Sequence, residues 1–224
     1  MIVALIPAHD EGPRIGPVVR AAAEHLPVIV VDDGSTDDTA ARAREAGATV
    51  VEQRPNQGKG AALRAGFVRA IAAGYDAVLT LDADGQHDPT EIPLFLAAWA
   101  SDPRPDLVIG RRNFRVMPPI RRLSNELGGR AFSWAVGRPI PDNQSGYRLV
   151  GRRLMEATLA SDEHGFEFEV EVITTCIRLG GRIAWVPIRT IYAGEPSHIR
   201  PVAHLRSFIR IVRKARREVR TPLG

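Results

Sequence analysis

Five short apolar runs, each followed by a stretch of helical character, constrain this chain more than any other feature. The runs are nearly continuous in Val, Ile, Leu and Ala, which is typical of strands buried on both faces. Buried strands that each lead into a helix indicate a parallel sheet covered by helices. We therefore predict an α/β fold, with strands at IVALIPA (2–8), PVIVVDD (27–33), ATVVEQ (48–53), AVLTLDAD (77–84) and DLVIGRR (106–112).

Polar residues follow each of these apolar runs. In a parallel sheet the carboxyl ends of the strands meet at one edge, and ligands bind just beyond that edge. The same edge is therefore expected to carry PAHDE, VDDGSTDD, QRPNQGKG, LDADGQHD and GRRN.

The fourth run ends in two aspartates, Asp82 and Asp84, one residue apart. Residues i and i+2 of a strand point to the same side, so both carboxylates can face one small volume. Carboxylate oxygens suit Mg²⁺ or Mn²⁺, which usually takes its other ligands from water and substrate phosphates. The pair thus predicts a clamp for a metal and a diphosphate, although an isolated Asp-X-Asp is often only a solvated turn.

Two other phosphate chemistries do not fit the sequence. Lys59, in NQGKGAAL, stands at a predicted helix start where backbone N–H groups favour anions. The stretch is not a nucleoside-triphosphate P-loop, because no Ser or Thr follows the lysine. LDADG resembles an aspartyl phosphatase signature, but Gln86 stands where Thr is needed and the stretch follows the fourth strand.

The second half of the chain has a looser pattern. Residues 117–137 indicate a loop and a helix, 165–181 a helix and 182–193 a strand, with a polar segment, PDNQSGYR, at 141–148. We predict one domain over residues 1–200, with a nucleotide half (1–112) and an acceptor half (113–200). Residues 201–224 are predicted to form a basic amphipathic helix with Leu205, Phe208, Ile209 and Val212 on its apolar face.

The charge is divided unevenly along the chain. Residues 1–110 hold 9 Lys and Arg against 16 Asp and Glu, whereas residues 111–224 hold 21 against 10. This division suits a cation site in the first half and anionic partners in the second. The single cysteine, Cys176, fits a reducing compartment and core packing. We see no membrane span or signal peptide, and therefore expect a cytoplasmic protein.

The stretches PAHDEG, VVDDGSTD, NQGKGAAL and LDADGQHDP, in this order and spacing, resemble the inverting family 2 glycosyltransferases. The resemblance covers residues 2–112 closely. DNQSGYRLVGR (142–152) and SHIRPVAHLRSFIRIV (197–212) are similar to the branch that includes dolichol-phosphate mannose synthase and bacterial polyprenyl-phosphate glycosyltransferases. The resemblance implies a GT-A fold, with a mostly parallel Rossmann-like sheet flanked by helices.

The resemblance also implies roles for individual residues on the donor side. The nucleoside would be contacted by Pro7, His9, Glu11 and Asp33. The DXD stretch, Asp82, Ala83 and Asp84, would face the donor diphosphate, with Asp84 and Gln86 as ligands of Mg²⁺ or Mn²⁺. Donor phosphate or sugar would also be met by Lys59 and Arg111.

The acceptor is expected at the basic second half. Asp142 is the candidate general base or acceptor-orienting residue, and the alternative is a loop-capping aspartate. Arg121, with Arg122 and Arg130, is expected to hold a lipid phosphate, and Ser197, His198 and Arg200 resemble a family stretch near the active-site lid. The C-terminal helix suits an anionic membrane surface. We do not expect nucleic acid, because aromatic residues are not interleaved with the basic ones.

We therefore predict a metal-dependent, inverting glycosyltransferase that moves a sugar from a UDP or GDP donor to a polyprenyl phosphate. It would act on the cytoplasmic face of the membrane as a peripheral protein. A soluble hydroxyl acceptor and a non-catalytic nucleotide-sugar-binding protein stay open as alternatives. A sugar-1-phosphate nucleotidyltransferase does not fit, because no Gly-rich loop follows the first strand. A homo-oligomer also stays open.

Overall fold

The computed structural model describes residues 1–114, 119–165, 167–189 and 201–220, with the side chains of 119–121, 124 and 201–208 left out. Over these residues the strands are β1 (Ile2–Ala8), β2 (Val28–Asp33), β3 (Thr49–Gln53), β4 (Ala77–Thr80), β5 (Leu107–Arg112), β6 (Arg148–Gly151) and β7 (Ile183–Ile188). The helices are α1 (Gly12–Ala23), α2 (Thr39–Glu45), α3 (Lys59–Ala72), α4 (Ile92–Trp99), α5 (Pro119–Val136), α6 (Arg152–Thr158), α7 (Glu167–Arg178) and α8 (Pro201–Arg220).

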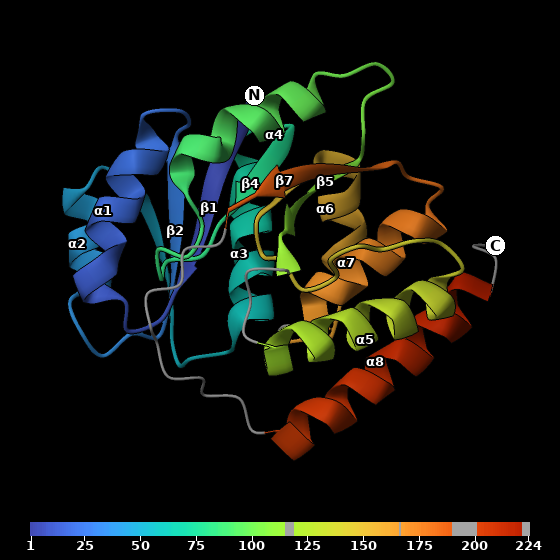
Figure 1. Ribbon diagram of the computed structural model, residues 1–224. Helices are drawn as coiled ribbons and strands as arrows, with labels where there is room; N and C mark the ends of the chain where they lie inside the picture. The colour runs from blue at the N-terminus through green and yellow to red at the C-terminus, as the bar shows by residue number, and fades with distance from the viewer. Residues whose placement is uncertain (115–118, 166, 190–200, 221–224) are drawn as a thin grey trace.

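One seven-stranded sheet runs through the molecule in the order β3-β2-β1-β4-β6-β5-β7 (Figure 1). β6 is antiparallel to both of its neighbours, and every other neighbouring pair is parallel. The prediction of a mostly parallel sheet is confirmed. β6 was not predicted, because four residues beside a polar segment carry too little periodicity to indicate a strand.

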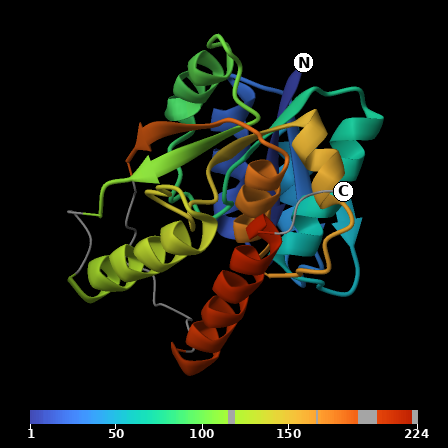
Figure 2. The same ribbon diagram turned by 90° about the vertical axis from the view of Figure 1, so that its right-hand side faces the viewer.

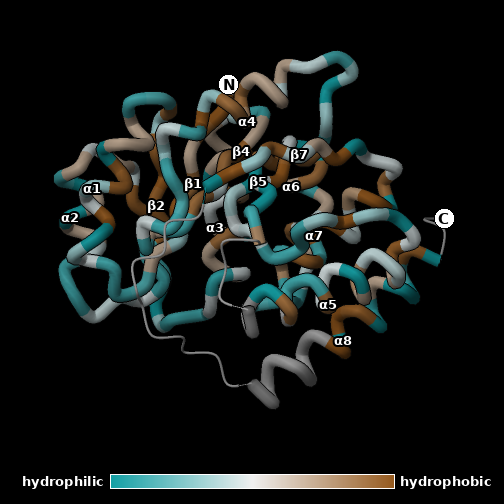
Figure 3. Tube along the Cα trace, in the orientation of Figure 1, coloured by the Kyte–Doolittle hydropathy of each residue, from teal (hydrophilic) through white to brown (hydrophobic). Residues whose placement is uncertain are grey.

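The core lies on both faces of this sheet, as the continuous apolar runs predict. Alternate strand residues point to opposite faces. Val3 and Leu5 of β1 pack with residues of α3, α5, α6, α7 and α8. Ala4 and Ile6 pack with residues of α1, α2 and α4 on the other face. In Figure 3 the hydrophobic colour is concentrated in these central strands.

The fourth predicted strand is shorter in the structure than in the sequence analysis. β4 ends at Thr80, and Asp82 and Asp84 lie in the turn that follows. The expectation that strand geometry aligns the two carboxylates is therefore wrong. Gly85, with φ +79°, turns the chain immediately after Asp84, in a conformation that favours glycine.

The C-terminal helix packs onto the body of the molecule. α8 lies beside α5 and α7 (Figures 1 and 2). Ile211 and Ala215 of α8 are each 2% exposed, whereas Ile209 is 42% exposed. The apolar face of α8 that meets the core is thus centred on Ile211 and Ala215, and Ile209 lies outside it. Within the described part of the chain, no helix combines the length and hydrophobicity needed to cross a membrane.

Candidate active site

A cavity of about 380 Å³ lies at the carboxyl ends of β1, β2 and β4. It brings together eight of the residues predicted for the donor site, although they come from four separate segments of the sequence. These are Pro7, His9, Glu11, Asp33, Lys59, Asp82, Ala83 and Asp84; the lining also includes Ala8, Asn56, Gly58 and Ala62.

Lys59 forms the electrostatic centre of this cavity. Its Nζ lies 2.6 Å from Oδ1 of Asp82 and 2.9 Å from Oε1 of Glu169. Burial lowers the pKa of Lys59, but the two carboxylates outweigh burial and raise it above its ordinary value. Burial raises the pKa of Asp82, but the neighbouring Lys59 ammonium outweighs burial and brings it down to about 2. Lys59 therefore stays protonated and Asp82 ionised at neutral pH.

Glu169 was not identified from the sequence. It lies in α7, and its side chain approaches Lys59 only because α7 packs against α3. Gly146 makes room for this arrangement, since a Cβ there would lie 3.0 Å from carboxylate oxygens of both Asp82 and Glu169. The spacing in FEFEVEV gives no signal that could single out Glu169 from its neighbours.

His87 supports the turn that carries Asp82 and Asp84. The imidazole is buried, and its Nδ1 accepts a hydrogen bond of 3.0 Å from the backbone N–H of Asp82. Burial lowers the pKa of His87, so the ring is neutral at pH 7. The ring also stacks on Tyr147, with 5.0 Å between centroids. The turn is thus held by His87, a residue that the sequence analysis did not select.

The residues predicted as metal ligands are compatible with a hard cation. Asp84 lines the cavity, and its Oδ1 accepts a 2.9 Å hydrogen bond from the backbone N–H of Gln86. No group of three or more His, Cys, Asp or Glu side chains in the described residues is placed to hold a metal by itself. Asp82 is already paired with Lys59. A carboxylate and an amide oxygen that share the cation with substrate phosphate match what Mg²⁺ accepts.

Asp33 shapes the cavity through the loop before α3. The side chain is 3% exposed, and its two oxygens accept hydrogen bonds from the N–H groups of Gln57 (2.8 Å) and Gly58 (2.7 Å). These contacts fix the loop that leads into Lys59. The nearest observable role of Asp33 is therefore to position this loop, and its predicted contact with the nucleoside stays a prediction.

Asp142 forms a buried ion pair with Arg112. It is 1% exposed, and Arg112 donates to it from Nε (2.7 Å) and Nη2 (2.8 Å). Its Oδ1 also accepts a hydrogen bond from the N–H of Gln144, as expected for a loop-capping aspartate. Because both carboxylate oxygens are occupied, this geometry favours an orienting role over proton abstraction. Arg112, which the sequence analysis passed over, is the cation that Asp142 orients.

Arg148 holds the segment that follows Asp142. This arginine is 2% exposed and donates to the carbonyl oxygens of Ser145 (2.6 Å), Asn143 (3.1 Å) and Glu169. It therefore ties the 142–146 segment to α7 beside the cavity. An arginine within a short strand carries no sequence signal for such a role.

Six predicted residues are not among the described residues that line the cavity. They are Gln86, which follows Asp84 in the turn, Asp142, which is paired with Arg112, and Arg111, Arg121, Ser197 and Arg200. Arg111 is exposed at the end of β5 and does not line the cavity. Ser197 and Arg200 lie outside the described residues, as does the side chain of Arg121. The roles predicted for these six residues stay predictions.

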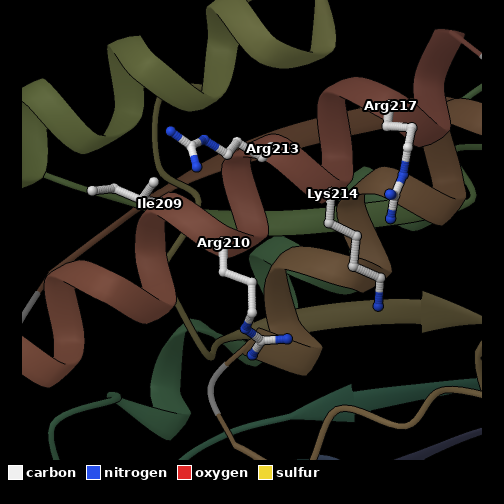
Figure 4. Close-up of a pocket in the computed structure, with 5 residues that line it drawn as sticks. All are labelled: Ile209, Arg210, Arg213, Lys214 and Arg217. Atoms are coloured by element: carbon white, nitrogen blue, oxygen red, sulfur yellow. The ribbon is translucent and has the colours of Figure 1, made fainter.

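A second hollow, of about 600 Å³, lies along α8 and is lined by Ile209, Arg210, Arg213, Lys214 and Arg217 (Figure 4). Arg210, Lys214 and Arg217 project from one side of the helix, and Arg213 from another. Arg210 and Lys214 are already paired with Glu163. This hollow is therefore part of the attachment of α8 and not an open anion site.

The chain is similar in sequence to a known enzyme family and to several of its members. Residues 3–157 match the family described as Glycosyl transferase family 2. Glycosyltransferase AglJ of Haloferax volcanii is 36% identical over 200 residues, covering 86% of this chain and 63% of AglJ. Polyprenol monophosphomannose synthase of Mycolicibacterium smegmatis is 32% identical over 200 residues, covering 82% of this chain and 75% of the synthase.

Solved structures of glucosyl-3-phosphoglycerate synthase from Mycobacterium tuberculosis share the fold. The complex with Mn²⁺ and UDP-glucose has a TM-score of 0.72 and 26% identity, covering 94% of this chain and 75% of that one. The complex with phosphoglyceric acid has a TM-score of 0.74 and 25% identity, covering 100% of this chain and 81% of that one.

Proposed function

The chain belongs to glycosyl transferase family 2 and is a glycosyltransferase with a GT-A fold; within that class, we propose that it moves a sugar from a nucleoside-diphosphate donor to a polyprenyl phosphate, with inversion. The observation that carries the donor assignment is the cavity at the sheet edge, where Pro7, His9, Asp33, Lys59 and Asp84 meet. A nucleoside, a diphosphate and a cation each have side chains of suitable chemistry there.

In this proposal the cavity residues stabilise the negative charge that develops on the diphosphate as it leaves the sugar. Asp84 and Gln86 would hold a divalent cation, which supplies positive charge to the departing diphosphate when bound. Lys59 keeps Asp82 ionised. Its own charge is already balanced by the carboxylates of Asp82 and Glu169 and does not depend on the donor. Asp33 fixes the loop beside the nucleoside end. The chain thus contributes a preformed electrostatic site more than a set of proton-transfer groups.

The acceptor is assigned by its chemistry. A lipid phosphate already carries negative charge near neutral pH and needs little help from a base to attack the sugar carbon. Asp142, which is buried and paired with Arg112, is poorly placed to remove a proton but well placed to orient that arginine. Arg112, and Arg111 beside it at the end of β5, are then the cations that would meet the incoming phosphate. The name of the Mycolicibacterium relative also supports a polyprenol-linked acceptor.

Asp84→Asn tests the donor assignment. We expect turnover of GDP-mannose or UDP-sugars, with polyprenyl phosphate and Mn²⁺ or Mg²⁺, to fall at least about 100-fold, the scale of losing one transition-state charge contact. Asp88→Asn is the matched control, because Asp88 caps the turn at Pro89–Glu91 and does not line the cavity. EDTA should abolish wild-type turnover. Unchanged turnover in Asp84→Asn would overturn the metal role.

A soluble acceptor is the second candidate, because the structural neighbour binds phosphoglyceric acid. The two acceptors are separated by one assay, in which the same donor is offered with polyprenyl phosphate in detergent or with 3-phosphoglycerate. We expect transfer to the lipid phosphate. Transfer to 3-phosphoglycerate alone would move the assignment to a soluble acceptor.

We also propose that the protein contacts the membrane through α5 and the neighbouring part of α8. Leu123, Leu127 and Trp134 of α5 are 59%, 56% and 65% exposed and lie on one side of the helix. Arg216 of α8 lies 3.4 Å from the centre of the Trp134 ring. Exposed apolar side chains next to cations suit the surface of an anionic bilayer. Ile211 and Ala215 of α8 are already buried in the core, so α5 would supply inserted side chains.

Vesicle flotation tests this surface. We expect the double variant Leu127→Ser, Trp134→Ser to bind vesicles of phosphatidylglycerol and phosphatidylcholine at least about tenfold more weakly. Full burial of one such side chain is worth about 1.5–3 kcal/mol, and about 1.4 kcal/mol already corresponds to a factor of ten. Val68→Ser is the control, because Val68 is 54% exposed on α3, away from α5. Equal losses in both variants, or no wild-type binding at low salt, would contradict the proposal.

A further inference from the structure

The loop between α6 and α7, residues 159–165, contacts two parts of the molecule that are far apart in the sequence. Side chains of α8 reach it from one side, and the first turns of α3 reach it from the other. α3 begins at Lys59, so this loop lies between the C-terminal helix and the donor cavity.

The carboxylate of Glu163 makes the contact with α8. The residue is 7% exposed, and Arg210 donates to its two oxygens from Nη1 (2.9 Å) and Nη2 (3.0 Å). Lys214 donates to Oε1 at 3.1 Å and also to Glu171 at 3.1 Å. Burial raises the pKa of Glu163, but the hydrogen bonds from Arg210 and Lys214 bring it below its ordinary value. The Glu163 carboxylate is therefore ionised at neutral pH, opposite the positive charges of Arg210 and Lys214.

The backbone of the same loop makes the contact with α3. The carbonyl oxygen of Glu163 accepts a hydrogen bond from Nη1 of Arg64, and that of His164 accepts one of 2.7 Å from the N–H of Gly60. The 159–165 loop and the start of α3 approach so closely that a Cβ on Gly60 would lie 2.7 Å from the carbonyl oxygen of Glu163. A Cβ on Gly58 would lie 2.6 Å from the oxygen of His164, and Gly58 has φ +92°.

Gly58 and Lys59 line the donor cavity. Contacts that fix the position of the first turn of α3 therefore also fix the position of these two residues in the cavity wall. We propose that Glu163 is a positioning residue for the donor site, which joins the attachment of α8 to the placement of Gly58 and Lys59. A loosened α8 would release the 159–165 loop, and with it the hydrogen bond that holds Gly60. The inference rests on the proposed function only in taking this cavity as the donor site.

Amide hydrogen exchange tests the connection without any ligand. In Glu163→Gln the side chain keeps its shape but loses the charge that Arg210 and Lys214 bind. We expect the amide of Gly60 to exchange at least about fivefold faster, the lower end of site-to-site coupling. Arg210→Gln should give the same change at Gly60, and it serves if Glu163→Gln does not fold. Arg213→Gln is the control, because it removes one charge from α8 without a hydrogen bond to Glu163.

Faster exchange confined to α8, with Gly60 unchanged in both variants, would overturn the inference. A second measurement links the connection to binding: the Kd for UDP and for GDP with Mn²⁺, by calorimetry. We expect Glu163→Gln to raise the Kd of whichever nucleotide binds about fivefold, and to raise the donor KM with little change in kcat. If the wild type binds neither nucleotide, the proposed function fails, while the exchange at Gly60 still decides whether Glu163 positions α3.

Discussion

At the residue scale, the cavity at the carboxyl ends of β1, β2 and β4 depends on one lysine between two carboxylates. Asp82 and Glu169 would repel each other if Lys59 were absent, because both carboxylates contact its ammonium group and lie against Gly146. The lysine therefore has a structural task that a direct phosphate contact would not require. Its removal should cost stability, and the part that comes from its charge can be separated by pH from the part that comes from packing of its stem.

We expect Lys59→Met to lower the free energy of unfolding at pH 7 by about 1–3 kcal/mol, the cost of leaving a charged partner unsatisfied. The pKa of Asp82 falls from 3.8 to about 2 in the fold, so the ion pair stabilises above pH 4 and this gain is lost as pH falls toward 2. The pKa of Lys59 is raised above 10.5, so the gain persists up to about pH 10. Urea unfolding at pH 7 and pH 2.5 measures the difference.

The matched control is Arg69→Met, which removes an exposed cation from the same helix. It should change the unfolding free energy by less than about 0.5 kcal/mol at either pH. A loss in Lys59→Met that stays the same at pH 2.5 would show that packing of the lysine stem, and not its charge, stabilises the cavity.

At the element scale, α8 combines two kinds of attachment. Ile211 and Ala215 are buried in the core, and Arg210 and Lys214 bind the carboxylate of Glu163. The sequence shows that the helix is amphipathic, but a helical wheel does not show which part of a broad apolar face will be covered. The neighbouring helices α5 and α7 decide this, because they meet α8 along the side that carries Ile211.

Two isoleucines of α8 provide a direct comparison. Ile211→Ala should lower the free energy of unfolding by about 2–4 kcal/mol, because it leaves a cavity in a packed core. Ile209→Ala, in which the lost side chain is 42% exposed, should cost less than about 1 kcal/mol. Chemical unfolding of the two variants measures both values. Equal losses would mean that α8 is docked differently from the arrangement described above.

At the scale of the whole molecule, the two halves of the chain are joined in one sheet. β6 and β7 come from the second half, and β6 inserts between β4 and β5 of the first. Both faces of the sheet are therefore covered by core residues from both halves of the chain. The uneven charge follows the halves in sequence, while the strands interleave in space.

This topology predicts that residues 1–112 do not fold alone. Without β6, the backbone groups of β4 and β5 that face it lose their hydrogen-bond partners, and the sheet face under α6 and α7 is uncovered. We expect the isolated fragment to lack a cooperative thermal transition and near-ultraviolet circular dichroism, both of which the full chain should show. A cooperative transition in the fragment would show that the first half has a core of its own.

The sequence by itself determined the parallel part of the sheet and the edge of the sheet at which the site lies. Continuous apolar runs can only be buried on both faces, and the carboxyl ends of parallel strands must share one edge. Pro7, Asp33, Lys59 and Asp84 could therefore be assigned to one place without a structure, and they line one cavity. Each of these residues stands next to a strong local signal, namely the end of a strand or the start of a helix.

Only the tertiary structure decided what those residues touch. Glu169 meets Lys59, Arg112 meets Asp142, and Glu163 meets Arg210 across separations of dozens of residues in the sequence. None of these partners has a periodicity or a motif of its own. Charge pairs of this kind depend on distances of about 3 Å, and such distances arise only when segments that are remote in the chain pack against one another.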